Sequence, residues 1–169
     1  VKAVREEKPN AVLVDAGDVF SGTLYFNEYK GLADIEFMNL MKYDMMTFGN
    51  HEFDLGNTEG GNTALADFAS KANFPFISSN VDFSQDTAMN KLQNNSITNE
   101  PENGQIYKAI IKEIDGEKVG FFGLTTEETT DIASPGNTTF ADYIESAEQT
   151  VDALEEQGVN KIVAVTHLG

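Results

Sequence analysis

The stretch TFGNHEFDLGN, residues 47–57, gathers groups that bind metals or move protons into a single turn. Asn50, His51, Glu52 and Asp54 fall within five positions, directly after the apolar run DMMTFG. Turn formation and solubility alone do not require four such groups so close together. We therefore expect this stretch to carry chemistry, and its residue types suggest more than one task.

Polar side chains also follow the other apolar runs that read as strands. In open α/β sheets, ligands bind beyond the carboxyl ends of the strands because the loops converge there. The chain has two histidines, and both occupy such positions. The side chains at these strand exits are Asp18, Asn50, His51, Asn80, Thr125, Thr126 and His167.

Three of these side chains suggest a metal site. Asp18 offers an anionic oxygen able to bridge two cations, Asn50 a neutral carbonyl oxygen, and His167 an imidazole nitrogen. This mixed set suits Zn, Mn, Co or Fe better than a calcium cage made only of oxygens. Two such ions would form a clamp for phosphoryl transfer, with a metal-bound hydroxide as the nucleophile.

His51 requires a separate role, because neighbouring side chains at a tight turn point in different directions. With Asn50 turned toward a metal, we expect His51 to face the substrate and Asp54 to hold its ring through a hydrogen bond. Such a pair can stabilise phosphoryl oxygens or protonate a leaving alkoxide. Glu52 is left to form a salt bridge or to cap nearby backbone.

Each candidate also has a plain structural interpretation. Asp18 could cap a turn, Asn50 could adopt a left-handed turn conformation, and His167 could be a satisfied interior histidine. Asp15 lies within a strand and is expected to be a structural carboxylate, or one that orients a metal ligand without binding the metal. Asn80 stays ambiguous, and Thr125 and Thr126 fit turn chemistry. Together these interpretations require several coincidences at one edge of one sheet.

The elements that would position these residues alternate between apolar strands and amphipathic helices. This alternation predicts an α/β sandwich with a mostly parallel central sheet and one antiparallel hairpin at Asp115-Gly116, where Glu113 lies across from Lys118. Residues 82–104, rich in Asn, Gln, Ser and Thr, are expected to form a flexible insertion. The expected strands are 11–17, 44–49, 74–80, 106–114, 118–125 and a buried run at 161–169; the expected helices are 31–43, 62–73 and 140–158.

Composition excludes several classes of protein. The chain of 169 residues has a formal net charge of -17, which disfavours nucleic-acid binding through a basic surface. It has no cysteine, so disulfides and thiolate chemistry are excluded. No apolar run is long enough for a membrane span, and no signal peptide opens the chain. The opening VKAVREEKPN reads as the end of a helix, so we expect a trimmed fragment.

GDVF, GNHEFD and THLG together resemble the calcineurin-like metallophosphoesterases, and the longer strings DAGDVFSG, FGNHEFDLG, SSNVD, VGFFGLTTEET and IVAVTHLG resemble the bacterial 5'-nucleotidase branch. The resemblance implies a partial catalytic domain over residues 1–169, in which Asp18 bridges two divalent metals, Asn50 and His167 bind the second, and His51 with Asp54 forms the catalytic dyad. It also implies a small nucleotide substrate, 5'-nucleotidase or 2',3'-cyclic phosphodiesterase activity, and export from a bacterium.

Two family features are not found in this sequence. These are the Asp-x-His motif of the first strand and the later Gly-His-x-His motif with the C-terminal nucleotide-binding domain. We therefore expect the chain to bind its two metals incompletely and to have little activity alone. The alternatives are a broader phosphodiesterase or nuclease on the same scaffold, and a non-catalytic acidic surface module.

Overall fold

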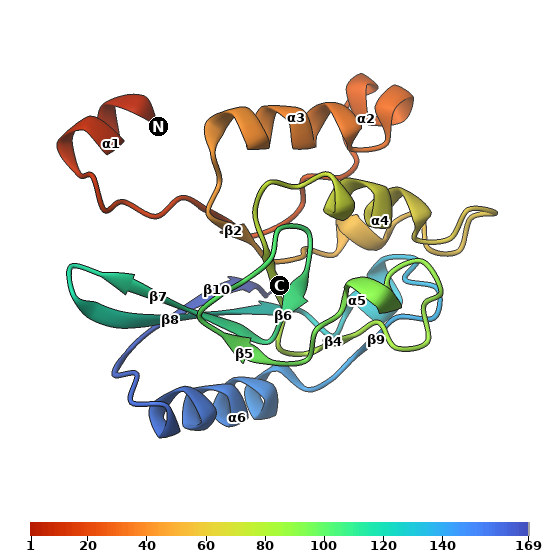
Figure 1. The fold of residues 1–169 in the computed structure, drawn as a ribbon. Coiled ribbons are helices and arrows are strands. Elements are labelled where there is room, and N and C mark those ends of the chain that lie inside the picture. The colour runs from red at the N-terminus through yellow and green to blue at the C-terminus, as the bar shows by residue number, and fades with distance from the viewer. Residues whose placement is uncertain (169) are drawn as a thin grey trace.

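Two four-stranded sheets pack face to face at the centre of the molecule, in a computed structural model that describes residues 1–168 (Figure 1). In the first sheet all pairings are parallel, and its order is β1 (Val14–Asp15), β2 (Met45–Met46), β3 (Phe76–Ile77) and β6 (Ile106–Tyr107). The order in the second is β10 (Lys161–His167), β8 (Glu117–Thr125), β7 (Ala109–Ile114) and β5 (Ile97–Thr98). A separate antiparallel pair joins β4 (Val81–Asp82) to β9 (Thr139–Phe140).

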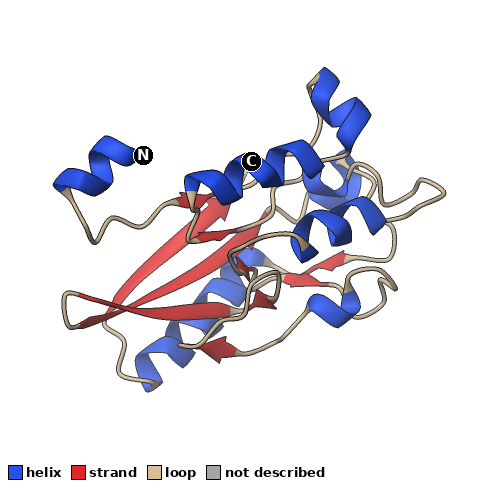
Figure 2. Ribbon diagram, turned by 45° about the horizontal axis from the view of Figure 1, so that its top comes forward, coloured by secondary structure: helices blue, strands red, loops and turns tan. Residues whose placement is uncertain are grey.

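Helices cover the outer faces of both sheets (Figure 2). The α-helices are α1 (Lys2–Glu7), α2 (Leu24–Tyr29), α3 (Leu32–Met41), α4 (Thr63–Ser70), α5 (Thr129–Ile132) and α6 (Tyr143–Glu156), and the 3-10 turns are η1 (His51–Phe53) and η2 (Asn90–Leu92). Helices α3 and α4 pack on the first sheet, and α6 packs on the second. The layers therefore run helix, sheet, sheet, helix.

The short strands are apolar on both faces because each face meets a different layer. On β2, Met45 packs between the two sheets and Met46 packs toward the helices. On β8, Phe121 faces the first sheet and Phe122 belongs to the cluster under α6. Because successive side chains of a strand point to opposite faces, one apolar run contributes both to the core between the sheets and to the core under the helices.

This architecture confirms the predicted mixed α/β class with parallel strands but corrects the prediction of one central sheet. Continuous apolar runs show that strands are buried on both sides, and they do not show whether a helix or a second sheet covers each side. The predicted hairpin is confirmed, since β7 and β8 pair antiparallel with Glu113 opposite Lys118. Asp115 and Gly116 both have positive φ, 53° and 77°, as its tight turn requires.

The segment expected to be a flexible insertion contributes to the core. Residues 82–104 include η2 and β5, and Phe83 and Met89 have no exposed surface. The side chain of Gln93 accepts a hydrogen bond from the Phe83 N–H at 2.9 Å and donates one to the Val81 carbonyl at 2.9 Å. Because most residues of the segment are polar, its composition does not reveal these few buried apolar side chains.

The last expected strand forms, but it is not buried as predicted. β10 pairs only with β8, at the edge of its sheet, and Val163 is 41% exposed. An apolar sequence cannot distinguish an edge strand from a central one. Gly169, the end of the predicted run, lies outside the described residues. Three further elements of the structure, α2, α5 and β9, were not predicted from the sequence.

Gly123 on β8 allows the sheets to approach, and its replacement tests this packing. A Cβ at Gly123 would stand 2.2 Å from the Ile77 carbonyl oxygen and 2.3 Å from Thr47 Oγ1. A Cβ at Gly120, on the same strand, would meet only side-chain carbons of Leu154 and Val159 at 3.0 Å or more. We expect Gly123→Ala to lower the free energy of unfolding by about 1–3 kcal/mol in urea denaturation, and by more than Gly120→Ala. Equal effects would contradict this account.

Candidate functional site

The loops that follow β1 and β2 touch at two glycines. A Cβ at Gly17 would stand 2.0 Å from the Gly49 nitrogen, and a Cβ at Gly49 would stand 2.3 Å from Asp18 Oδ1. Gly17 also has a φ of 93°, which favours glycine. Both loops therefore need glycine at the contact, and this contact brings Asp18 beside the GNHEFD turn.

Glu52 ties the two loops together from beneath. Its carboxylate accepts four backbone N–H groups: Oε2 accepts those of Asp18 at 2.8 Å and Gly49 at 2.6 Å, and Oε1 accepts those of Val19 at 2.7 Å and Phe20 at 3.1 Å. Only 1% of Glu52 is exposed. Burial raises the pKa of Glu52, and the four N–H groups oppose that rise because they stabilise the ionised form. The expectation that Glu52 caps backbone is confirmed.

Asp18 adopts a left-handed backbone conformation, with φ 65°, which Asp tolerates better than most residues. Its Oδ1 accepts the backbone N–H of His51 at 3.0 Å, and its Oδ2 lies 3.3 Å from Nε2 of His167. Asn50 has an ordinary right-handed φ of -72°, and its Oδ1 lies 3.1 Å from the same Nε2. Asp18, Asn50 and His167 therefore converge, although they come from three separate strand exits.

The hydrogen bonds of His167 indicate which atom is free to bind a cation. Its Nδ1 lies 3.0 Å from the carbonyl oxygen of Ala16, which can only accept, so Nδ1 carries a proton. Nε2 is therefore the ring nitrogen whose lone pair a cation could use, and it faces the oxygens of Asp18 and Asn50. A cation among these atoms would meet one nitrogen and two oxygen donors, and a backbone carbonyl bonded to the other nitrogen is the usual support of a metal-binding histidine. The donor set therefore fits a metal.

His51 and Asp54 form the predicted pair. Nδ1 of His51 lies 2.7 Å from Oδ2 of Asp54, and the same oxygen accepts the hydroxyl of Ser21 at 2.5 Å. The hydrogen bond to Asp54 raises the pKa of His51, which favours the imidazolium form. The His51 side chain is 47% exposed, so its ring is accessible from solvent. Ser21 was not predicted, although it lies within the quoted string DAGDVFSG.

Asp15 and Asn80 lie near the site without joining the three converging groups. Asp15 accepts the Gly17 N–H at 3.0 Å, and burial raises its pKa. Asn80 exchanges hydrogen bonds with the Thr125 backbone at 2.7 and 3.0 Å. Thr125 in turn donates its hydroxyl to the Phe48 carbonyl at 2.7 Å, directly before the GNHEFD turn. Asn80 thus supports the strand exits at a distance.

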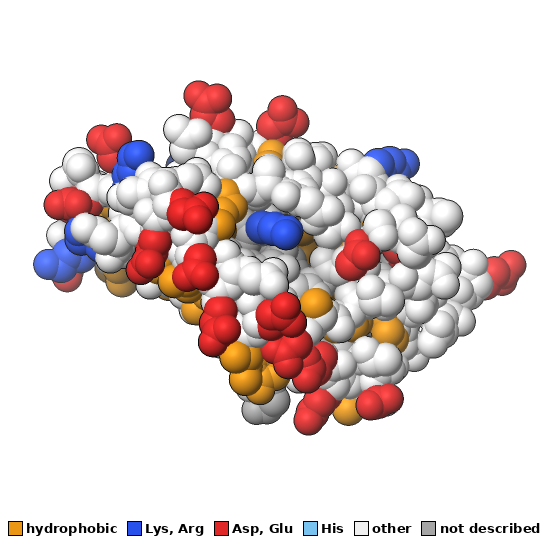
Figure 3. All heavy atoms as spheres, turned by 90° about the horizontal axis from the view of Figure 1, so that it is seen from below, with side chains coloured by type: hydrophobic (Ala, Val, Ile, Leu, Met, Phe, Trp, Pro, Cys, Tyr) orange, Lys and Arg blue, Asp and Glu red, His pale blue; other side chains and the backbone are white. Residues whose placement is uncertain are grey.

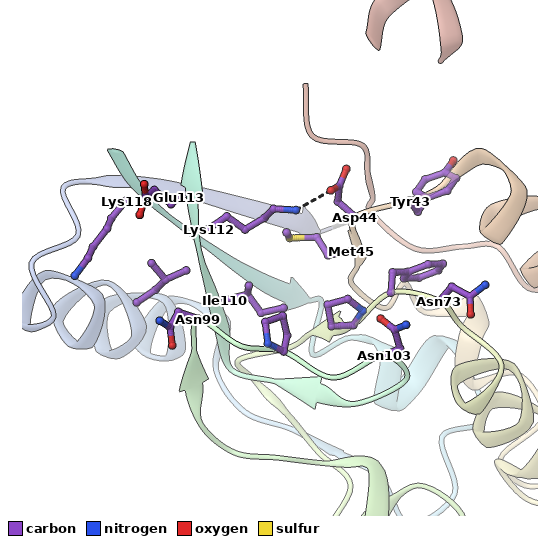
Figure 4. A pocket seen from close by; sticks show the side chains of 14 residues that line it. Tyr43, Asp44, Met45, Asn73, Asn99, Asn103, Ile110, Lys112, Glu113 and Lys118 are labelled. Atoms are coloured by element: carbon purple, nitrogen blue, oxygen red, sulfur yellow. Dashed lines mark hydrogen bonds and ion pairs between the residues drawn. The ribbon is translucent and has the colours of Figure 1, made fainter. Parts of the chain in front are cut away.

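A hollow of about 500 Å³ lies away from these residues (Figure 4). It opens beside Asp44 and Asn73, which precede β2 and β3, so it lies at the opposite end of the first sheet from the strand exits. Asp44 and Lys112 form an ion pair of 2.7 Å at its rim. The size of a hollow therefore does not locate the candidate site in this protein.

The ligand types within residues 1–168 bound what the site can be. Among these residues, no three His, Cys, Asp or Glu residues cluster so as to hold a metal ion. The candidate site has two such residues, Asp18 and His167, and its third converging group is the amide of Asn50. No helix in this part of the chain is long and apolar enough to cross a membrane.

Comparisons with known proteins agree with the geometry. The family described as calcineurin-like phosphoesterase matches residues 1–169. The trifunctional nucleotide phosphoesterase protein YfkN of Bacillus subtilis is 45% identical over 100% of this chain, and the 5'-nucleotidase of Rattus norvegicus is 37% identical over 100%. The crystal structure of a 5'-nucleotidase precursor from Thermus thermophilus has a TM-score of 0.83 and 41% identity, and the match covers 99% of this chain and 30% of that one. The chain spans 13% of the Bacillus protein and 27% of the rat protein.

Replacing Glu52 by glutamine tests its role in joining the loops. Glutamine keeps the shape, but its NH₂ group would face two of the four N–H donors and could not accept from them. We expect Glu52→Gln to lower the free energy of unfolding by about 1–3 kcal/mol for each N–H left without an acceptor, as measured by urea denaturation. The exposed Glu36 on α3 gives a matched control, Glu36→Gln, which should change stability by less than about 0.5 kcal/mol. Equal stability of the two variants would refute the role.

Proposed function

This chain belongs to the calcineurin-like phosphoesterase family, and from that premise we propose that it carries part of a site that hydrolyses phosphate esters of nucleotides, as a 5'-nucleotidase or a 2',3'-cyclic phosphodiesterase does. The observation that carries this proposal is the convergence of Asp18 Oδ2 and Asn50 Oδ1 on Nε2 of His167, at 3.3 and 3.1 Å. The names of the relatives, a nucleotide phosphoesterase and 5'-nucleotidases, support the substrate class.

Asp18, Asn50 and His167 are the residues that would hold a divalent ion. When bound, divalent ions at such a site polarise phosphoryl oxygens and lower the pKa of water. The oxygen and nitrogen donors suit Zn, Mn, Co or Fe. Asp18 is the residue suited to bridge two ions, since its carboxylate has two oxygens. Three side chains are fewer than two ions require, so residues 1–169 alone should bind metal weakly.

His51 acts on the substrate side of this arrangement. Its ring is held by Asp54, and Ser21 holds Asp54, so the exposed part of the imidazole has a fixed direction. The raised pKa of His51 favours a charged donor that can stabilise a phosphoryl oxygen or give a proton to the leaving alkoxide. His51 therefore has a chemical role distinct from that of its neighbour Asn50.

The charge of the molecule favours small nucleotides over polynucleotides. Asp and Glu side chains are spread over the face that carries α6 (Figure 3), whose sequence YIESAEQTVDALEE includes no basic residue. A polyanionic backbone would be repelled by such a surface, whereas a single phosphate needs only the local charge of a bound cation. Export from the cell is part of the proposal, supported by a relative titled a precursor.

Separate substitutions distinguish the two roles in the full gene product, assayed with AMP and Mn²⁺. We expect His51→Ala to lower kcat by about 10²–10⁴-fold with little loss of bound metal, because it removes a proton donor and no ligand. Asn50→Ala should lower metal affinity by at least about 10–100-fold, the loss that follows removal of a group that only supports a ligand. Metal content would be measured by elemental analysis after gel filtration.

One outcome would contradict this division of roles, and another would contradict the expected weak metal binding. Loss of metal in His51→Ala equal to that in Asn50→Ala would show that His51 is a ligand. Robust turnover of AMP or a generic phosphodiester by residues 1–169 alone would show that their three donors suffice. Ser21→Ala offers a conservative control, since it removes one hydrogen bond to Asp54 and should reduce kcat less than His51→Ala does.

A further inference from the structure

A second group of oxygen atoms gathers beside the loop that follows the His51–Asp54 pair. The hollow there, of about 360 Å³, is lined by Asn, Thr, Asp, Gly and Ala residues from four short runs: 56–58, 60–63, 86–88 and 136–137. Among the described residues that line it, none is Lys, Arg or His. It shares no residue with the converging groups of the candidate metal site.

A buried carboxylate forms the wall of this hollow. Asp86 is only 6% exposed, and its Oδ1 accepts the backbone N–H groups of Ala88 at 2.9 Å and Met89 at 3.1 Å. Its Oδ2 accepts the amide of Asn62 at 2.7 Å. Buried charges are normally paired with an opposite charge or coordinate a metal, and these partners carry no positive charge.

The side chain beside Asp86 has an unsatisfied acceptor. Asn62 is 2% exposed, and its Nδ2 faces three oxygens: those of Asp86, the Pro135 carbonyl at 3.1 Å and Thr138 Oγ1 at 3.3 Å. Its Oδ1 is buried without a hydrogen-bond partner. That oxygen stands 2.9 Å from where a Cβ on Gly56 would lie, and Gly56 also lines the hollow.

The neighbouring hydroxyls add acceptors rather than donors. Thr58 donates its proton to the Leu55 carbonyl at 2.6 Å, and Thr63 donates to the Gly60 carbonyl, so their remaining lone pairs are free. A ligand that contacts Asp86, Asn62 Oδ1 and these two hydroxyls must therefore supply positive charge or protons to oxygens. A hard divalent cation is the ligand that prefers carboxylate, amide and hydroxyl oxygens without nitrogen or sulfur.

We propose that Asp86, with Asn62 Oδ1 and nearby hydroxyl and carbonyl oxygens, forms a calcium site that joins the segment after Asp54 to residues 86–88 and 135–138. With one carboxylate, its affinity should resemble that of extracellular calcium modules, with a Kd of about 10⁻⁴–10⁻³ M. Magnesium should bind more weakly, because it requires a small, nearly ideal octahedron.

Calorimetric titration and thermal melting of the metal-stripped chain with CaCl₂ test the site. We expect binding in the wild type and in Asp82→Asn, a control that removes an exposed carboxylate outside the hollow which also caps backbone. Asp86→Asn should bind at least about tenfold more weakly. Asp18→Asn should bind as the wild type does, because it alters only the other site.

The variant Asn62→Asp separates a cation site from a purely structural amide. It places a carboxylate oxygen where the amide nitrogen meets Asp86, so without calcium the two negative charges should lower the melting temperature. Calcium should restore that temperature and bind this variant more tightly than the wild type. The proposal is overturned if calcium affects neither protein, if it fails to rescue Asn62→Asp, or if its effect disappears in Asp18→Asn.

Discussion

One buried carboxylate determines the geometry of the candidate site. Glu52 accepts backbone N–H groups from residues 18–20 and from Gly49, so two loops that are far apart in sequence share one acceptor group. Burial of a carboxylate is costly, and four charge-assisted hydrogen bonds offset that cost only while both loops stay in place. The positions of Asp18 and Asn50 relative to each other follow from this arrangement. The glycine contact between Gly17 and Gly49 is the steric condition that makes it possible.

The same turn explains how adjacent residues serve different purposes. In the 3-10 turn η1, side chains three positions apart lie on the same side, which brings His51 and Asp54 together at 2.7 Å. Glu52 points into the protein, and Asn50 points toward His167. A single short motif thereby connects the backbone, the proposed metal and the proposed substrate. The apolar core under the turn, where Phe53 packs against Phe48 and Phe83, fixes its base.

Part of this could be predicted from sequence, because the carboxyl ends of parallel strands lie at one edge of a sheet. That rule grouped Asp18, Asn50 and His167 with the other strand-exit residues, and their ligand chemistry singled them out. It assumed one sheet, whereas His167 ends β10 in the second sheet, so the convergence also depends on how the two sheets pack. The tight turn separated His51 from Asn50. The two-sheet arrangement could not be predicted, since Met45 and Met46 read as one apolar pair whichever layers cover them. The hydrogen bond between His167 and the Ala16 carbonyl could not be predicted either, because every residue has a backbone carbonyl and nothing in the sequence marks this one. The anchors Phe83 and Met89 were hidden by their polar neighbours, and the edge position of β10 depends on pairing rather than on composition.

The presence of only two histidines makes the central claim directly measurable. In a ¹⁵N NMR titration of the histidine-labelled chain with Zn²⁺, each imidazole gives its own set of nitrogen resonances. The account predicts that Nε2 of His167 shifts to a metal-bound position while its Nδ1 stays protonated, and that the nitrogens of His51 remain near their metal-free positions. A metal-bound shift at His51, or an unchanged Nε2 of His167 at saturating Zn²⁺, would contradict it.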